Sequence, residues 1–388
     1  MMDASRRNLL KAAAILMVDH MASTRRSAFA AEPAADSGRK VIIVACGGVR
    51  RAETFSASGF QNIPHLYKDL LPQSVFYPFA RNAGVTSHYN TISSILTGNW
   101  QRLDDWGMTP PASPTMFEHM RKRLALTQDK TWLISSNKAL TSRIGASSVR
   151  GFGPSYGANV VFPKQLLINA VVRAAAQGHA VHSADRSTVQ PEFEAMLKSD
   201  NYDGLGWAIS GDTSFLDPRT QATMQQAIED LVHTNAPATG DEFTFLVSAE
   251  VMRRFAPSLL VVTFSDMEVA HFGSYAMHLG GIRSMDRLVS ELWSLVGELP
   301  AYKGKTSLFV LPEFGRDLDG SNTNGFFNHR QNDDSTRLTW MMCLGDAVRK
   351  AQVIEHPVEH TDLCPTIAQL FGLKDLELPG KPLPGLEI

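Results

Sequence analysis

Three side chains of the types that bind metals follow an apolar run that ends near residue 264 of this 388-residue chain. They are Asp266, Glu268 and His271, and they lie within six residues of one another. Carboxylates and imidazoles gathered in this way suit a divalent metal ion. The segment therefore predicts a metal site just beyond a buried strand.

A second carboxylate and histidine follow the apolar run that ends at Leu311. Glu313 opens the sequence Glu-Phe-Gly-Arg, which ends at Arg316, and His329 comes after a polar loop. A carboxylate at a strand end with a histidine returning after a loop is again typical of metal ligands. A salt bridge between the acidic residue and Arg316 is the alternative, and the sequence leaves both open.

Small polar residues and a histidine stand at the start of a predicted helix that ends at Gly98. They are Thr86, Ser87 and His88. Free N–H groups and the helix dipole favour an anion at such a position, so a phosphate or a sulfate would suit it. The alternative is that Ser87 or Asn90 only caps the helix.

Two adjacent glycines, Gly47 and Gly48, follow the first predicted strand. Glycines let the backbone turn tightly and come close to a ligand. A tight turn from strand to loop would account for them equally well.

Buried strands are needed to position these segments. Continuous β-branched and apolar runs, typical of strands covered on both faces of a parallel sheet, occupy residues 40–45, 259–264 and 307–311. Helical stretches are predicted at 163–176, 220–235 and 281–299. This alternation predicts an α/β fold with a mostly parallel central sheet sandwiched by helices. Strands that end in polar residues place the site at one edge of that sheet.

The composition argues against a nucleic-acid partner and against a fold held together by disulfides. Hydrophobic residues make up 44% and charged residues 20% of the chain, as in globular proteins with a sizeable core. The formal net charge of −2 gives no broad attraction to nucleic acid, so we expect no nucleic-acid partner. The three cysteines, Cys46, Cys343 and Cys364, are too few for a disulfide framework. A protein partner cannot be inferred from the charge.

The N-terminus resembles a twin-arginine export signal. Residues 5–11 read Ser-Arg-Arg-Asn-Leu-Leu-Lys, and Ala-Phe-Ala at 28–30 matches the small residues that a signal peptidase recognises. The apolar run between them is too short to span about 30 Å of hydrocarbon, so we expect no transmembrane anchor. The pattern predicts a signal peptide over residues 1–30, a single domain over 31–388 and a periplasmic or secreted protein. A basic amphipathic helix is the alternative.

Taken in order, these segments resemble the alkaline phosphatase superfamily, which includes sulfatases, nucleotide phosphodiesterases and phosphopentomutases. The shared features include the helix that ends in Leu-Thr-Gly and the late Asp-x-x-Pro-Thr that begins at Asp362. A family of uncharacterised secreted proteins in that clan is more similar still. It shares Gly-Gly ahead of Thr-Phe, a histidine ahead of Leu-Thr-Gly, and Glu-Phe-Gly-Arg with a later histidine. The resemblance spans residues 41–373 and implies an alkaline-phosphatase-like fold.

The resemblance also implies a metal-dependent hydrolase that acts on a small anionic phosphate or sulfate ester or on a glycan. Working enzymes hold two metals, with an aspartate at the end of the first strand and an Asp-His pair at a later strand end. Here Gly47 and Gly48 occupy the position of the aspartate at the end of the first strand. Glu313 followed by phenylalanine occupies the position of the Asp-His pair. His88 occupies the place of the usual hydroxyl or thiol nucleophile.

The resemblance leaves ligands for one divalent metal ion, which would be zinc, manganese or calcium. The resemblance implies four of them: Asp266, His271, Glu313 and His329. His88 would then act as base, nucleophile or extra ligand, and Thr86 is a candidate hydroxyl nucleophile. The alternative is a catalytically degenerate member of the superfamily that binds a ligand or a protein partner.

Overall fold

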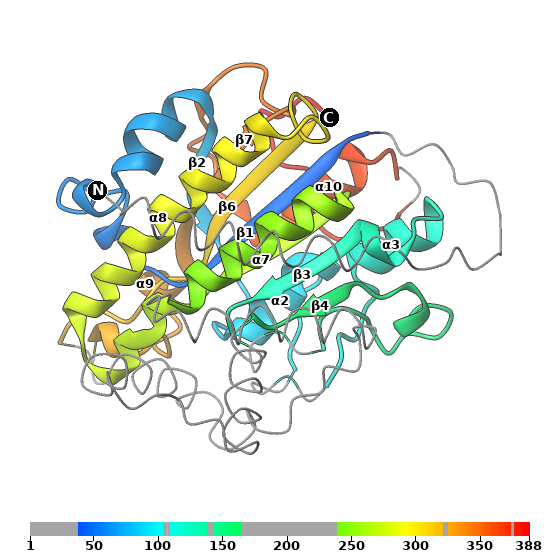
Figure 1. Cartoon of the computed structure of the whole chain (residues 1–388). Helices are drawn as coiled ribbons and strands as arrows, with labels where there is room; N and C mark the ends of the chain where they lie inside the picture. Colours follow the sequence, from blue (N-terminus) through cyan, green and yellow to red (C-terminus); the bar gives the residue numbers. More distant parts are fainter. Residues whose placement is uncertain are drawn as a thin grey trace, which may run out of the picture.

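A mixed sheet with helices on both faces forms the core of the protein (Figure 1). The computed structural model describes residues 38–103, 107, 109–137, 141, 143–163, 239–320, 325–373 and 376–388. The described residues form one nine-stranded sheet in the order β4-β3-β5-β1-β6-β7-β2-β8, with β9 paired to β2. The predicted signal peptide, residues 1–30, and the predicted helices at 163–176 and 220–235, apart from residue 163, lie outside these ranges.

The strands confirm the expectation of a mostly parallel sheet. Strands β4, β3, β5, β1 and β6 run parallel to one another, and β7 is antiparallel to both β6 and β2. The strand bounds are β1 Lys40–Gly48, β2 Val75–Arg81, β3 Thr131–Ser135, β4 Asn159–Val161, β5 Leu259–Phe264, β6 Thr306–Phe314, β7 Leu338–Gly345, β8 Gln352–Val353 and β9 Val358–Glu359.

Helices cover both faces of this sheet. The α-helices are α2 His88–Thr97, α3 Met116–Arg123, α7 Gly240–Phe255, α8 Tyr275–Glu298, α9 Asp334–Arg337 and α10 Leu363–Leu370. The short 3-10 and π segments are η1 Arg51–Glu53, η2 Phe60–Asn62, η3 Leu66–Leu70, η4 Leu71–Gln73, η5 Gln128–Lys130, η6 Pro154–Tyr156, η8 Asp266–Phe272, η9 Gly325–Phe327 and η10 His360–Asp362. None of these helices has the length and apolar composition of a membrane span.

Two apolar layers explain why β1 reads as a continuous hydrophobic run. Ile42 and Val44 point into the layer shared with α7 and α8, which cross the front of the sheet in Figure 1. Ile43 and Ala45 point into the opposite layer, shared with α2, α3 and α10. Side chains alternate along a strand, so a strand covered on both faces must be apolar at every position. Each buried branched side chain stabilises the fold by roughly 1.5–3 kcal/mol.

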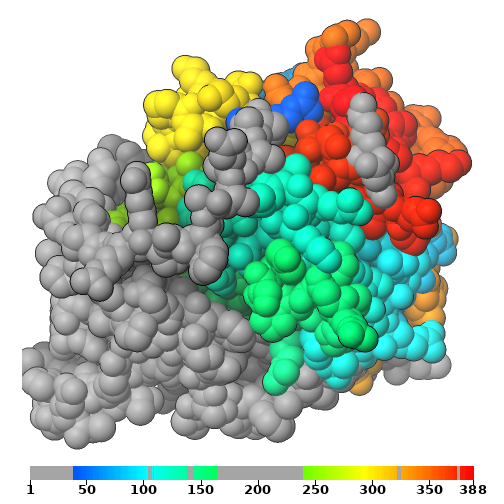
Figure 2. Space-filling model, turned by 90° about the vertical axis from the view of Figure 1, so that its right-hand side faces the viewer, coloured from blue at the N-terminus to red at the C-terminus, as the bar shows by residue number. Residues whose placement is uncertain are grey.

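Segments that are far apart in the sequence meet within the second layer. Helix α10 packs against α2 and α3, and Figure 2 shows the red C-terminal part of the chain beside the cyan segment. Gly98 ends α2 in the left-handed conformation, with φ of 69°, as predicted for a helix that stops at a glycine. The cysteines Cys46, Cys343 and Cys364 are buried and free.

The strand register brings the polar segments to one edge of the sheet. Cys46 of β1 is level with Phe264 of β5, and Gly48 is level with Phe314 of β6. The carboxyl ends of three parallel neighbours therefore lie side by side, and the loops that leave them meet. Strand β6 runs farther than the predicted 307–311, so Glu313 lies within the strand and not after it.

His360 is a fully buried histidine at the start of η10. Its Nε2 lies 2.9 Å from the Thr339 hydroxyl, which itself donates to the carbonyl of Ala80 at 3.2 Å. The hydroxyl therefore accepts a hydrogen bond from Nε2–H of a neutral ring. Burial lowers the pKa of His360 to about 3.

This buried ring should make the protein sensitive to acid. The unfolded chain binds a proton at His360 near pH 6.5, but the folded chain does so only near pH 3, so stability falls as the pH drops through this interval. At pH 4 the loss is about 3 kcal/mol. In urea unfolding at pH 7 and pH 4, His360→Gln should shrink the difference by about this amount. His65→Gln, at an exposed histidine, should not.

If His360→Gln lost as much stability as wild type between pH 7 and pH 4, this assignment would be wrong. Part of the acid sensitivity should remain in any case, because burial also lowers the pKa of His278 to about 4.

Candidate metal centre

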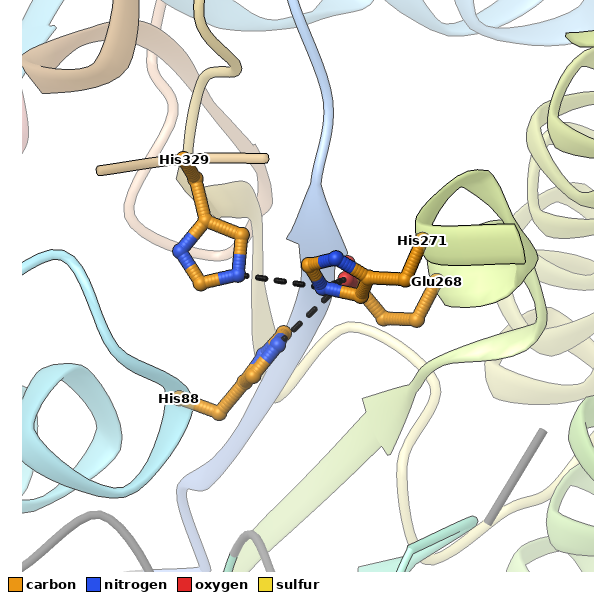
Figure 3. A group of neighbouring side chains, drawn as sticks. All are labelled: His88, Glu268, His271 and His329. Atoms are coloured by element: carbon orange, nitrogen blue, oxygen red, sulfur yellow. Dashed lines mark hydrogen bonds and ion pairs between the residues drawn. The ribbon is translucent and has the colours of Figure 1, made fainter. Parts of the chain in front are cut away.

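Four side chains point toward one another at the carboxyl edge of the sheet (Figure 3). His88 begins α2, Glu268 and His271 lie on η8, and His329 lies in the loop that follows η9. One candidate ligand atom from each residue lies within 4.8 Å of all the others. The side chains of His88, Glu268 and His271 are only 3%, 6% and 4% exposed. We refer to these four residues as the cluster.

Three distances within the cluster are close to those around one tetrahedral ion. Glu268 Oε2 lies 3.1 Å from His271 Nε2 and 3.4 Å from His88 Nε2. His329 Nε2 lies 3.2 Å from His271 Nε2. Ligand atoms around a tetrahedral zinc with bonds of about 2.0–2.1 Å are about 3.3–3.4 Å apart. Three imidazoles and one carboxylate also form a donor set that suits zinc.

His329 presents a lone pair to the cluster. Its Nδ1 lies 2.7 Å from the backbone carbonyl of Thr86, which can only accept, so Nδ1 carries the proton. Burial, together with the charge of His88, holds the pKa of His329 well below its usual range. The ring is therefore neutral, and its Nε2 is the unprotonated nitrogen that a metal requires.

His88 is held between two carboxylates. Its Nδ1 donates to Glu313 Oε2 at 2.8 Å, and its Nε2 faces Glu268. Burial alone would lower the pKa of His88, but the charges of Glu268 and Glu313 outweigh it and raise the pKa well above the usual range. The metal-free ring is thus positively charged, and a metal would bind in place of the Nε2 proton. A carboxylate behind a histidine is a common means of orienting a metal ligand.

Glu268 is kept ionised although it is buried. Burial raises its pKa, but the charges of Arg316 and His88 outweigh this effect and hold the pKa well below the usual range. Arg316 Nη2 donates to Oε2 at 2.5 Å, and the backbone N–H of Gly48 donates to Oε1. Both oxygens are therefore fixed in direction.

The two glycines at the end of β1 make room for these side chains. A Cβ atom at position 47 would overlap Oε1 of Glu268. A Cβ atom at position 48 would lie 2.9 Å from the ring of Phe314. The glycines are needed because neighbouring side chains fill the space where their own side chains would lie.

The structure brings His88, His271 and His329 together but directs Asp266 elsewhere. Asp266 Oδ2 accepts a hydrogen bond from the backbone N–H of Asp241 at 3.1 Å, and Asp241 Oδ2 accepts one from the backbone N–H of Asp266 at 3.0 Å. The 3-10 geometry of η8 explains this, because residues three apart lie on the same side of such a helix. Glu268 and His271 have this spacing and share the inner side. Glu268 belongs to the segment that the sequence predicts to bind metal, but the resemblance does not imply it as a ligand.

Glu313 and Thr86 lie behind the cluster. Glu313 contacts His88 from the far side of the ring. The hydroxyl of Thr86 donates to the backbone carbonyl of His329 at 2.8 Å, and the carbonyl of Thr86 accepts from the ring of His329. Both residues therefore hold cluster histidines in place. Ser87 accepts a hydrogen bond from Asn90 at 2.8 Å, within the first turn of α2.

Comparisons with known proteins show the fold. No family model matches the chain, and no curated protein matches it in sequence. It superposes on a protein of the alkaline phosphatase superfamily from Vibrio parahaemolyticus with a TM-score of 0.50 and 11% identity, over 96% of this chain and 76% of that one. The sulfatase PsFucS1 from Pseudoalteromonas sp. gives a TM-score of 0.51 and 11% identity, over 98% and 75%. The chain has an alkaline-phosphatase-like fold.

A third solved structure agrees. The phosphonate monoester hydrolase SpPMH from Silicibacter pomeroyi gives a TM-score of 0.50 and 14% identity, over 89% of this chain and 76% of that one. The expected fold class is therefore confirmed. At these identities the likeness concerns the fold and not the chemistry.

Gly47→Ala should disrupt the cluster by steric overlap. The added methyl group displaces the carboxylate of Glu268, which is one of four candidate ligands. We expect metal affinity to fall by roughly 10- to 100-fold, measured by competition with a chromogenic chelator. Gly280→Ala is the matched control, because a Cβ atom there meets no atom within 4 Å. Equal affinity in Gly47→Ala and wild type would refute the place of Glu268 in the site.

Proposed function

We propose that the protein binds one divalent metal ion, with zinc the best match, through the cluster, and that it hydrolyses small phosphate or sulfate esters. The convergence of three imidazoles and one carboxylate, whose candidate ligand atoms all lie within 4.8 Å of one another, carries this proposal. The fold supports it, because the chain superposes on a sulfatase and on a phosphonate monoester hydrolase. A divalent ion that takes a fifth ligand beside these four would polarise an ester oxygen or lower the pKa of a bound water.

The surrounding residues have positioning roles in this proposal. Glu313 directs Nε2 of His88 toward the cluster, which makes His88 a ligand and not a nucleophile. Thr86 fixes the tautomer of His329. The hydroxyl of Thr86 is engaged with a carbonyl, so water is the better nucleophile in this site. Asp266 stabilises the turn that carries Glu268.

A non-catalytic function is favoured by one observation. Four protein ligands complete the coordination of a tetrahedral zinc, whereas catalytic zinc sites keep one position open. In this second candidate function the ion would join α2, η8 and the loop after η9. The protein would then bind an anionic ligand or a partner without hydrolysing it.

Metal analysis and ester hydrolysis test both functions. The purified wild type should carry one ion per chain, and His271→Ala and His329→Ala should each lose it, since each removes a ligand. Hydrolysis of aryl phosphates or aryl sulfates should fall by roughly 100-fold or more with the metal. His119→Ala, which removes a half-buried ring that packs on Phe152, should keep both.

The outcomes separate the two candidates. Stoichiometric metal without hydrolysis of any aryl ester would favour the non-catalytic function. A wild-type protein that binds no zinc, manganese or calcium would eliminate both.

We also propose that the chain is exported by the twin-arginine route, on the strength of residues 5–11. Replacing Arg6 and Arg7 together by lysine keeps the charge but removes the planar guanidinium groups. Cell fractionation should then find the uncleaved chain in the cytoplasm, whereas wild type should be found outside it, starting near Ala31. The second arginine pair, Arg25 and Arg26, gives the matched control. Normal export of the first variant would count against this route.

A further inference from the structure

Arg316 is a fully buried arginine beside the cluster, just after the end of β6. Its Nε donates to the carbonyl of Gly48 at 2.7 Å, and its Nη1 donates to the carbonyl of Phe326 at 3.2 Å. Its Nη2 donates to Oε2 of Glu268 at 2.5 Å. Oxygens from the end of β1, from η8 and from η9 thus surround one guanidinium group.

The same oxygen of Glu268 also faces the cluster histidines. Oε2 lies 3.1 Å from His271 Nε2 and 3.4 Å from His88 Nε2. It therefore stands between the guanidinium of Arg316 and the position that fits a metal. A carboxylate placed in this way is shared by two cations. One is permanent, because arginine keeps its proton at any ordinary pH.

Because the carboxylate of Glu268 is buried, leaving it without a counter-charge would destabilise the fold. The side chains of Glu268 and Arg316 are 6% and 0% exposed, so water compensates neither. Removing one partner of a buried ion pair strongly destabilises a protein, because the other charge is left without compensation. Arg316 provides that compensation whether or not a metal is bound.

We propose that Arg316 is a permanent cation of the centre. It shares Glu268 with the metal, holds the carboxylate in position before the metal arrives, and limits the centre to one exchangeable ion. Arg316 is a positioning residue, since it acts on the ion through Glu268. This inference rests on the proposed metal binding.

Thermal unfolding of Arg316→Met at pH 8 tests the inference. The metal-free variant should melt on the order of 10 °C below metal-free wild type, because Glu268 loses the counter-charge of Arg316 and keeps only that of His88. Zinc chloride should raise the melting temperature more in the variant than in wild type, since the metal then replaces the positive charge that Glu268 has lost. An equal or smaller rise in the variant would overturn the inference.

A matched control separates this role from the loss of a buried arginine in general. Arg121 is half-buried and donates to the carbonyls of Gly157 and Leu126. Arg121→Met should lower the melting temperature but leave the zinc-induced rise at the wild-type value. A changed rise in this control would mean that the effect is not specific to Arg316.

A double variant keeps the test decisive if Arg316→Met does not fold. Arg316→Met combined with Glu268→Gln removes both charges, so its metal-free form should melt closer to wild type than Arg316→Met does. A double variant that is no more stable than the single one would overturn the inference.

The number of ions bound by wild type distinguishes this inference from the proposed function. One zinc per chain is expected, and two would overturn the inference while leaving metal binding intact. No bound ion at all would overturn both.

Discussion

A carboxylate held away from water must be compensated, and this requirement at Glu268 organises the carboxyl edge of the sheet. Arg316, two histidines and a backbone N–H surround its two oxygens. The end of β1 has no side chains at positions 47 and 48, because the space next to it is filled by Glu268, Phe314 and Arg316. The level register of β5, β1 and β6 brings these segments within reach of one another.

The sheet could be predicted from the sequence because its central strands are covered on both faces. Such strands are apolar at every position, and β1, β5 and β6 were recognised on this basis. Their ends were harder to place. Strand β6 continues through Pro312 to Phe314, where polar and turn-forming residue types suggest a loop. The pairing of Gly48 with Phe314 extends the strand, and a single sequence does not reveal that pairing.

The cluster, too, could be predicted only in part from the sequence. The sequence identified His88, His271 and His329 as candidates because each follows or begins a predicted element. The prediction named Asp266 and not Glu268 as a ligand, although the choice depends on whether the turn is extended, α-helical or 3-10. Seven residues are too few for periodicity to settle that question. The roles of Thr86 and Glu313 behind the histidines depend on contacts between distant segments.

The hydrogen bond between Thr86 and His329 joins residues 243 positions apart in the chain. A contact of such long range costs the closure entropy of the intervening chain before it can stabilise the fold. A zinc finger uses its metal to begin folding. Here the four candidate ligands come from α2, η8 and the loop after η9, so we expect the complete site to form only when the sheet brings these segments together. A bound ion would then stabilise the complete domain, and only folded chains would carry it.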